Sequence, residues 1–250
     1  MRMGALLGPV TEPANANFLP DQARRFEGAG FSSLWAAQAI GRGFLMPDPF
    51  LMLTAAATTT DTVELGTAVL QVPLYQPADI AYRAFALQQL SGGRLILGVG
   101  AGSTVKDFAV FGRDYDARFT TFNAALPELR DWLTTGARGE ADLTPWSNVR
   151  DATPLFYGTW GKGVKRAASE FDGWIASGAY RTVDEVCDAL ETYRGAGGGR
   201  AIVSTLQITA ETDLGEFSER LARFAEAGFD DAVVMLMPGA PDPEAVRALL

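Results

Sequence analysis

The stretch SGGRLILGVGAGST, residues 91–104, decides the fold class. Its apolar run from Leu95 to Val99 leads directly into Gly100 and Gly102. Continuous apolar runs of this length are typical of parallel strands that are covered on both faces. Glycines directly after such a strand permit a tight turn, or a close approach of the backbone to a ligand. The stretch therefore predicts a buried parallel strand that ends in a turn.

Seven other short apolar runs alternate with amphipathic helical patterns along the 250 residues. Eight such units average about 31 residues each, which is the size of one βα module. Strict alternation of eight units favours a closed barrel over an open doubly wound sheet. We therefore expect an α/β fold, a compact (β/α)8 TIM barrel, as a single domain over residues 1–250. The expected strands are 3–8, 33–38, 63–72, 94–100, 154–158, 173–178, 201–208 and 231–237.

Composition excludes several classes of function. The net charge of −9, without a basic cluster, argues against nucleic acid or an anionic membrane as partner. A single cysteine, Cys187, excludes an internal disulfide and agrees with a cytoplasmic location. The chain has no histidine, which removes Ser-His-Asp triads and imidazole bases, and we expect no metal site. If the chain is an enzyme, something other than imidazole or a metal ion carries its chemistry.

A second glycine-rich segment, YGTWGKGVKRAASEF, follows the expected fifth strand and opens a helix. Backbone N–H groups at a helix N-terminus, with a lysine beside them, predict a phosphate site. Ser177 and Gly178, at the end of the sixth strand, are placed to share the same anion. The alternative, tight turns that need positive φ, stays open for each segment. The residues of the glycine-rich segment that we assign to this site are Gly158, Thr159, Gly161, Lys162, Gly163 and Val164.

Residues 48–104 resemble the signature region of the bacterial luciferase-like superfamily, and residues 154–178 resemble its phosphate-loop segment with a DGW strand. Members are flavin-dependent monooxygenases, or oxidoreductases that use the deazaflavin coenzyme F420. The resemblance covers essentially the whole chain, with 63–104 as its specific part. It implies a (β/α)8 barrel that holds a flavin or deazaflavin ring in its mouth. The 63–104 stretch resembles the deazaflavin branch slightly more than the FMN branch.

The resemblance also implies a cofactor site. Family members often carry a non-proline cis peptide bond or a bulge in strand three, against the back face of the ring. The matching place is Thr67, Ala68 and Val69, with the Ala68–Val69 bond as the expected cis peptide. Gly100, Ala101, Gly102 and Ser103 would border the ribityl chain and phosphate, and the 158–164 and 177–178 segments would complete the phosphate site.

The chain departs from the family at the end of strand two, where many members carry a histidine or an acid. Gln38 stands there, and its amide can form hydrogen bonds but cannot act as a base near neutral pH. Gln38 is our only candidate catalytic residue. Four other polar side chains on the expected upper loops are interpreted as mainly structural: Arg42, Asp48, which is placed to cap a helix at Pro49, Tyr75 and Asp107. Residues 134–152 are expected to form a long loop.

The resemblance implies an oxidoreductase or monooxygenase that uses coenzyme F420 or FMN. It would transfer hydride to or from a small organic substrate, or oxygenate it. The alternative is a non-catalytic flavin-binding protein of the same fold, which the missing acid or histidine would suit. An aldolase using a Schiff-base lysine is disfavoured because no expected strand contains lysine. Family barrels often dimerise, so a homodimer is a further expectation.

Overall fold

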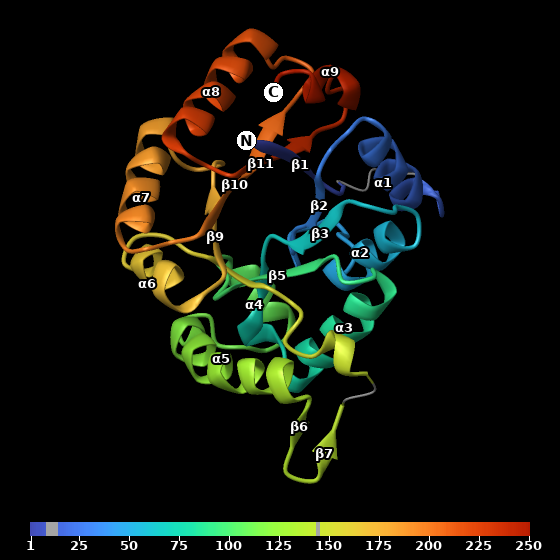
Figure 1. Cartoon of the computed structure of the whole chain (residues 1–250), viewed down its shortest axis with the longest axis vertical. Helices are drawn as coiled ribbons and strands as arrows, with labels where there is room; N and C mark the ends of the chain where they lie inside the picture. Colours follow the sequence, from blue (N-terminus) through green and yellow to red (C-terminus); the bar gives the residue numbers. More distant parts are fainter. Residues whose placement is uncertain (9–14, 144–145) are drawn as a thin grey trace.

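The computed structural model describes residues 1–8, 15–143 and 146–250. In this part of the chain, parallel strands close into a barrel, because β3 pairs with β2 on one side and with β5 on the other (Figure 1). The predicted TIM barrel is confirmed. The barrel strands, in spatial order, are β3 (Glu64–Thr67) with its continuation β4 (Leu70–Gln71), β2 (Ser33–Ala36), β1 (Arg2–Leu6), β11 (Asp231–Leu236), β10 (Arg200–Ile208), β9 (Gly173–Ser177), β8 (Leu155–Gly158) and β5 (Leu95–Gly100).

Helices surround the barrel (Figure 1). A capping box opens α7: the Thr182 hydroxyl accepts from the Glu185 N–H, and the Glu185 carboxylate accepts from the Thr182 N–H. None of the described helices is long and apolar enough to cross a membrane. The helices are α1 (Phe18–Gly28), α2 (Pro49–Ala57), α3 (Pro77–Leu90), α4 (Val105–Val110), α5 (Arg118–Thr135), α6 (Gly163–Glu170), α7 (Val183–Gly195), α8 (Leu214–Ala227) and α9 (Pro243–Arg247), with a 3-10 turn η1 (Val72–Leu74).

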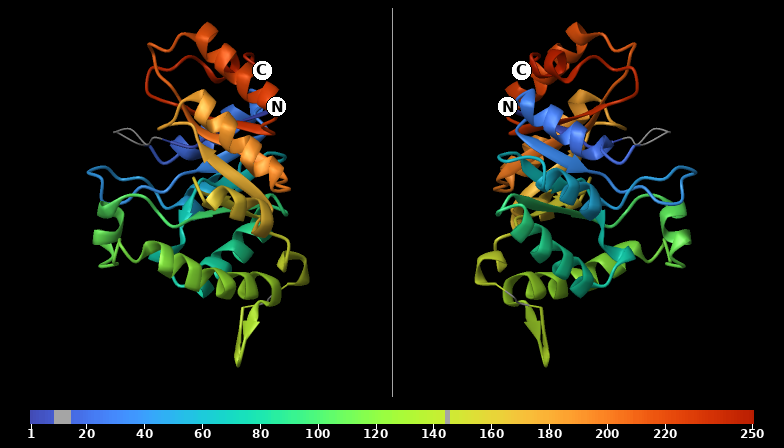
Figure 2. Two further views of the ribbon diagram at one scale, coloured as in Figure 1. Left: turned by 90° about the vertical axis from the view of Figure 1, so that its left-hand side faces the viewer. Right: turned by 90° about the vertical axis from the view of Figure 1, so that its right-hand side faces the viewer.

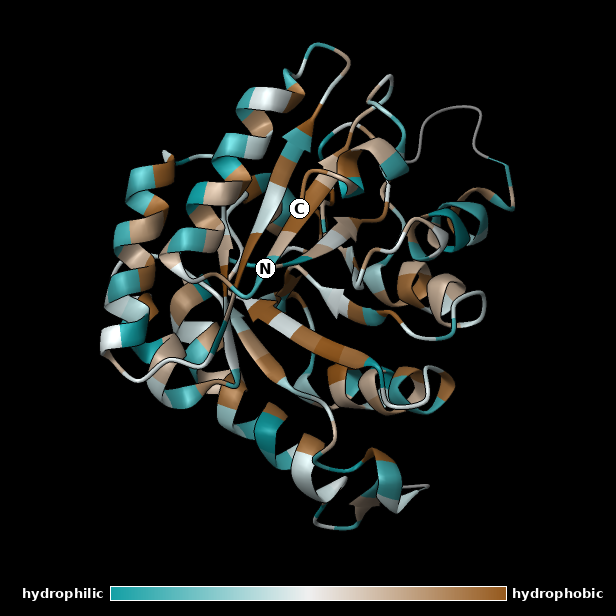
Figure 3. Cartoon of the chain, turned by 45° about the horizontal axis from the view of Figure 1, so that its top comes forward, coloured by the Kyte–Doolittle hydropathy of each residue, from teal (hydrophilic) through white to brown (hydrophobic). Residues whose placement is uncertain are grey.

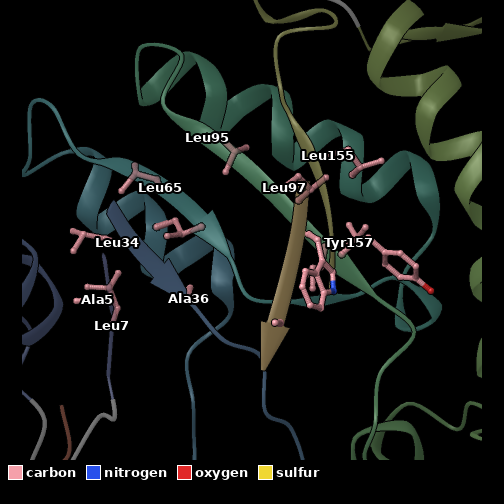
Figure 4. Packing of buried hydrophobic residues seen from close by; sticks show 14 of the residues in the cluster. Ala5, Leu7, Leu34, Ala36, Leu65, Leu95, Leu97, Leu155 and Tyr157 are labelled. Carbon is pink, nitrogen blue, oxygen red and sulfur yellow. The ribbon is translucent and has the colours of Figure 1, made fainter. Parts of the chain in front are cut away.

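Strand residues alternate between two cores. In β5, Leu95, Leu97 and Val99 face the helices and join the large outer core, whereas Ile96 lies in a separate cluster inside the barrel. Figure 4 shows outer-core side chains of neighbouring strands, among them Leu95 and Leu97. Figure 3 shows largely apolar strands in the middle of the molecule, surrounded by helices that carry many hydrophilic residues. The continuous apolar runs in the sequence follow from burial of both strand faces.

The expected loop over 134–152 is wrong in part. Helix α5 extends to Thr135, and a hairpin of β6 (Ala137–Arg138) and β7 (Ala141–Asp142) follows, projecting from the barrel in Figure 1. Gly139 has φ +61° in the two-residue turn, a conformation that glycine adopts without steric cost. A 3-10 turn, η2 (Ser147–Val149), comes before β8, while residues 144 and 145 of the expected loop lie outside the described residues.

Candidate functional site

The C-terminal mouth of the barrel has a floor of small and apolar side chains. The inner cluster below it is filled by Leu6, Trp35, Ile96, Phe156, Ile175, Ile202 and Val233. Ala37, Ala68, Val69 and Met235 pack on this cluster and remain partly exposed. Because inward-facing strand residues recur every second position, Gly98, Gly158 and Ser177 are the next inward positions after Ile96, Phe156 and Ile175 on their own strands. Of these floor positions, only Met235 carries a long side chain.

The third strand is interrupted between β3 and β4 by a cis peptide bond at Ala68–Val69, as predicted. The Val69 side chain packs against the ends of both β5 and β8. A Cβ atom added to Gly100 would come within 2.8 Å of Val69 Cγ2, and one added to Gly158 would overlap Val69 Cγ1. The packing of Val69 therefore explains both glycines, and their contact with a cofactor stays a prediction.

The turn after β5 carries the remaining residues predicted there. Gly102 has φ +85°, and a Cβ atom on it would lie 2.5 Å from Gln71 Oε1, so both conformation and space require glycine. Ala101 is buried and Ser103 is exposed. Gln71 Oε1 is buried and has no hydrogen-bond partner within the described residues.

Asp107 forms hydrogen bonds that join three segments at the mouth of the barrel. It lies in α4, not on a loop, and is fully buried. Its carboxylate accepts from Arg42 Nε at 2.8 Å and Nη2 at 2.6 Å, from Gln71 Nε2 at 2.8 Å and from the Ile40 N–H at 3.2 Å. Burial alone would raise the pKa of Asp107, but the bonds from Arg42, Gln71 and Ile40 outweigh burial and hold that pKa below its usual range. Asp107 therefore remains ionised and serves as an anchor.

Gln38, at the end of the second strand, is buried and fixed in orientation. Its Oε1 accepts from the Gln71 N–H at 2.8 Å, so its Nε2 must be the atom that faces Tyr75 and donates to Tyr75 Oη. Burial, together with the nearby Asp48, raises the pKa of Tyr75 to about 12. Asp48 also caps α2 by accepting from the Phe50 N–H, as predicted. Gln38 and Tyr75 are thus hydrogen-bonding groups at neutral pH and not bases.

The two predicted phosphate segments lie side by side, because β8 and β9 are paired neighbours. Gly161 has φ +59° and is exposed, and the exposed Lys162 stands at the N-terminus of α6. Thr159 lies against Gly163, where a Cβ atom would overlap its hydroxyl, and Val164 is buried in the core. The structure thus brings 158–164 and 177–178 together, with Ser177 exposed and Gly178 buried.

Two arginines that sequence reasoning missed belong to the same end of the barrel. Arg220 of α8 donates from Nη2 to the Gly178 carbonyl at 2.8 Å, and its buried Nε has no partner in the described segments. Burial lowers the pKa of Arg220. Arg181 lies over the Trp160 ring at 3.9 Å. Neither these arginines nor Lys162 forms an ion pair with any residue that the structure describes, and no pattern in the sequence distinguishes Arg181 or Arg220 from ordinary surface cations.

Known proteins share this architecture. The family model for luciferase-like monooxygenases matches residues 3–233, nearly the whole chain. The chain belongs to this family. Relatives of the chain include monooxygenases and F420-dependent oxidoreductases.

Curated relatives of this luciferase-like chain differ in activity. A 4-hydroxyprotoasukamycin monooxygenase of Streptomyces nodosus subsp. asukaensis is 35% identical over 49% of the chain and 33% of the relative. An F420-dependent glucose-6-phosphate dehydrogenase of Amycolatopsis mediterranei is 29% identical over 64% of the chain and 53% of the relative. The chain spans about half the length, or less, of these relatives.

Solved structures share the fold over a longer range. An F420-dependent secondary alcohol dehydrogenase, in complex with an F420–acetone adduct, superposes with a TM-score of 0.79 at 18% identity, covering 100% of this chain and 98% of that chain. The oxygenating constituent of 3,6-diketocamphane monooxygenase from Pseudomonas putida, in complex with FMN, gives a TM-score of 0.70 at 18% identity, covering 88% of this chain and 70% of that chain. At this identity the likeness establishes the fold alone.

Proposed function

We propose that the chain binds a flavin-type cofactor, coenzyme F420 or FMN, in the barrel mouth and catalyses a redox reaction of a small organic substrate. The reaction would be hydride transfer to or from that substrate, or its oxygenation. The observation that carries the proposal is the floor of Ala37, Ala68, Val69 and Met235. A flat ring needs a broad apolar surface that no large side chains obstruct, and this floor fits that need.

The anionic end of such a cofactor would also meet a suitable surface, one that carries cations and hydroxyl groups. Lys162, Arg181 and Arg220 have no carboxylate partners in the part of the chain that the structure describes, and Ser177 and Thr159 add hydroxyl groups beside them. In a chain of net charge −9, cations without ion pairs on neighbouring loops and on α8 favour an anionic ligand there. Coenzyme F420 carries glutamyl carboxylates in addition to its phosphate, so this surface favours F420 over FMN.

Either cofactor supplies hydride transfer when it is bound, and reduced FMN also supplies oxygen activation. The chain's own residues bind, orient and hydrogen-bond. Gln38 Oε1 is occupied by the Gln71 N–H, and one Nε2 hydrogen is donated to Tyr75. The second Nε2 hydrogen is free to donate to a substrate oxygen, which makes Gln38 an electrophilic group.

A parallel titration tests the proposal. Purified protein is titrated with F420, with FMN and with riboflavin, which lacks the phosphate, and binding is followed by ring absorbance and calorimetry. We expect F420 to bind more tightly than FMN, and FMN more tightly than riboflavin. Absence of binding by all three would contradict the proposal. Binding without turnover over a broad panel of alcohols, ketones and enones would favour the non-catalytic flavin-binding alternative.

A further inference from the structure

Strand β10 contains one extra residue on its way to the barrel mouth, the side from which the segment after β2 (light blue) and α4 (green) project in Figure 2. Val203 pairs with Ala232 of β11 and Leu206 pairs with Val234, so three residue steps on β10 match two on β11. Thr205, within this β-bulge, has φ +61°. A β-branched residue rarely adopts a positive φ, and strain of this kind is found mainly at functional sites.

The bulge places two hydroxyl groups on the inner side of the barrel. Ile202 of β10 and Ile175 of β9 are paired, and both belong to the inner cluster. Two positions further along, Ser204 is paired with Ser177, so Ser204 is the next inward position on β10. The Thr205 hydroxyl lies 3.3 Å from the Ser204 hydroxyl and therefore on the same side of the strand. We call Ser204 and Thr205 the hydroxyl pair.

The hydroxyl pair keeps hydrogen-bonding capacity for a ligand. Ser204 is buried, whereas Thr205 is partly exposed. Their mutual contact is the only side-chain hydrogen bond that either residue forms within the described part of the chain. Two hydroxyls carry two donor hydrogens and four acceptor lone pairs, and one mutual bond uses one of each. The pair can therefore donate one hydrogen bond to a ligand and accept others from it.

The position of the hydroxyl pair suits a neutral group. Its neighbour on β9 is Ser177, which carries no charge. Lys162 and Arg181 stand on the loops beyond the ends of β8 and β9, and Arg220 binds the carbonyl of Gly178, the residue that follows β9. The anionic end of a cofactor is thus expected beyond the strand ends, while the hydroxyl pair lies within β10, beside the floor.

We propose that the hydroxyl pair binds the pyrimidine-dione edge of the cofactor ring. This inference rests on the proposed function and assigns the orientation of the ring in that site. Flavin and deazaflavin rings share this edge, on which two carbonyl groups flank one N–H group. A hydroxyl matches such an edge, because it can donate to a carbonyl oxygen and accept from an N–H group. The apolar remainder of the ring then lies over Ala37, Ala68 and Val69.

Removal of the Thr205 hydroxyl tests this assignment. Calorimetry measures the binding of F420, FMN and riboflavin to the unaltered protein and to Thr205→Val. Loss of one neutral hydrogen bond weakens binding about fivefold, so we expect this loss, by the same factor, for every ring compound that binds. Thr205→Ser, which keeps the hydroxyl, should restore the affinity. Thr192→Val is the matched control, because Thr192 is exposed on α7 and its hydroxyl donates to the Asp188 carbonyl.

A second variant and a ring analogue separate hydrogen bonding from folding. Thr205→Gly removes the hydroxyl and tolerates the positive φ, so it should weaken ring binding without lowering the urea midpoint. In 2-thio-FMN and 4-thio-FMN, sulfur replaces one carbonyl oxygen of the dione edge. The unaltered protein should bind one of these analogues about fivefold less tightly than FMN, as expected for one lost hydrogen bond, whereas Thr205→Val should bind that analogue and FMN alike.

The outcomes distinguish this inference from the proposed function. If the ring compounds bind the unaltered protein and bind Thr205→Val and Thr205→Gly as tightly, the assignment is overturned and the cofactor site stands. If Thr205→Val weakens FMN but not riboflavin, the hydroxyl pair contacts the phosphate, and the assignment is again overturned. If no ring compound binds the unaltered protein, the proposed function fails and the assignment fails with it.

Discussion

The two ends of the barrel differ in how their charges are arranged. At the N-terminal end, four strand-initial side chains, Arg2, Glu64, Arg200 and Asp231, form a closed network of two cations and two anions. Arg200 binds Glu64 across the barrel at 2.7 and 2.9 Å and Asp231 at 2.7 and 3.1 Å, while Arg2 binds both acids. Asp231 is fully buried within this network.

At the C-terminal end, polar groups are left available. Gln71 Oε1 and Arg220 Nε are buried without partners in the described part of the chain, and Lys162 and Arg181 have no ion pair there. The fully buried Asp107 pairs there with Arg42, whose side chain is about one-third exposed. A closed network at one end stabilises the fold, whereas the exposed Lys162 and Arg181 at the other end are available to a ligand.

Removing Asp231 should have the largest effect on stability. Asp231→Ala leaves two arginine side chains with one remaining acid, Glu64, and loss of a partner in a buried network costs about 3 kcal/mol or more of unfolding free energy. Urea denaturation measures this loss of unfolding free energy. The control is Asp184→Ala, which breaks an exposed ion pair with Arg223 and should cost less than about 1 kcal/mol. Equal losses in both variants would contradict the account of the N-terminal end.

At the mouth, Ala68→Phe should abolish binding of F420 and FMN while the fold survives. A phenyl ring on the floor occupies the space that the cofactor ring needs, whereas Ala68 is only partly buried. Calorimetry gives the affinity, and circular dichroism with thermal unfolding gives the fold. Ala227→Phe, on the exposed end of α8, should bind as the unaltered protein does. If a folded Ala68→Phe protein binds the cofactor normally, the cofactor ring does not lie on this floor.

The cationic side of the mouth, with Lys162, Arg181 and Arg220, should show a smaller effect. Arg220→Gln is expected to weaken F420 and FMN binding about tenfold, the equivalent of about 1.4 kcal/mol, and to leave riboflavin binding unchanged. Arg223→Gln is the matched control, because Arg223 lies one turn further along α8 and is paired with Asp184. An equal loss of riboflavin affinity would show that Arg220 supports the fold and not the anion.

Lowering the pH should reduce the stability of the protein slightly, through carboxylates at both ends of the barrel. Burial would raise the pKa of Glu64, but its bonds to Arg200 and Arg2 outweigh burial and lower it, as is also true of Asp107. Lowered folded-state pKa values give stability that is present above the unfolded pKa, about 4, and is lost as pH falls through the folded values. Urea midpoints between about pH 6 and 3 should therefore decline, and Asp107→Asn should decline less steeply. A stability that rises on acidification would contradict both networks.

The strands were predictable because burial of both faces leaves apolar runs, and the cis bond at Ala68–Val69 followed from the family resemblance. The N-terminal network was not predicted, although each of its members begins a strand, a signal that sequence inspection can use. Asp107 was assigned to a loop because α4 is only six residues long and has no side-chain cap. The bond from the Gln71 N–H to Gln38 depends on the local path of β4, which residue patterns do not encode.

The most direct test of the account is a crystal structure of the protein grown with F420 or with FMN. We predict that the ring lies against Ala37, Ala68 and Val69 and that its anionic end points toward Lys162 and Arg220. A second place exists for comparison, a groove of about 360 Å³ between α1 and α9 lined by residues such as Phe18, Gln22 and Leu236. A ring bound in that groove, with the mouth free of cofactor, would contradict the central claim.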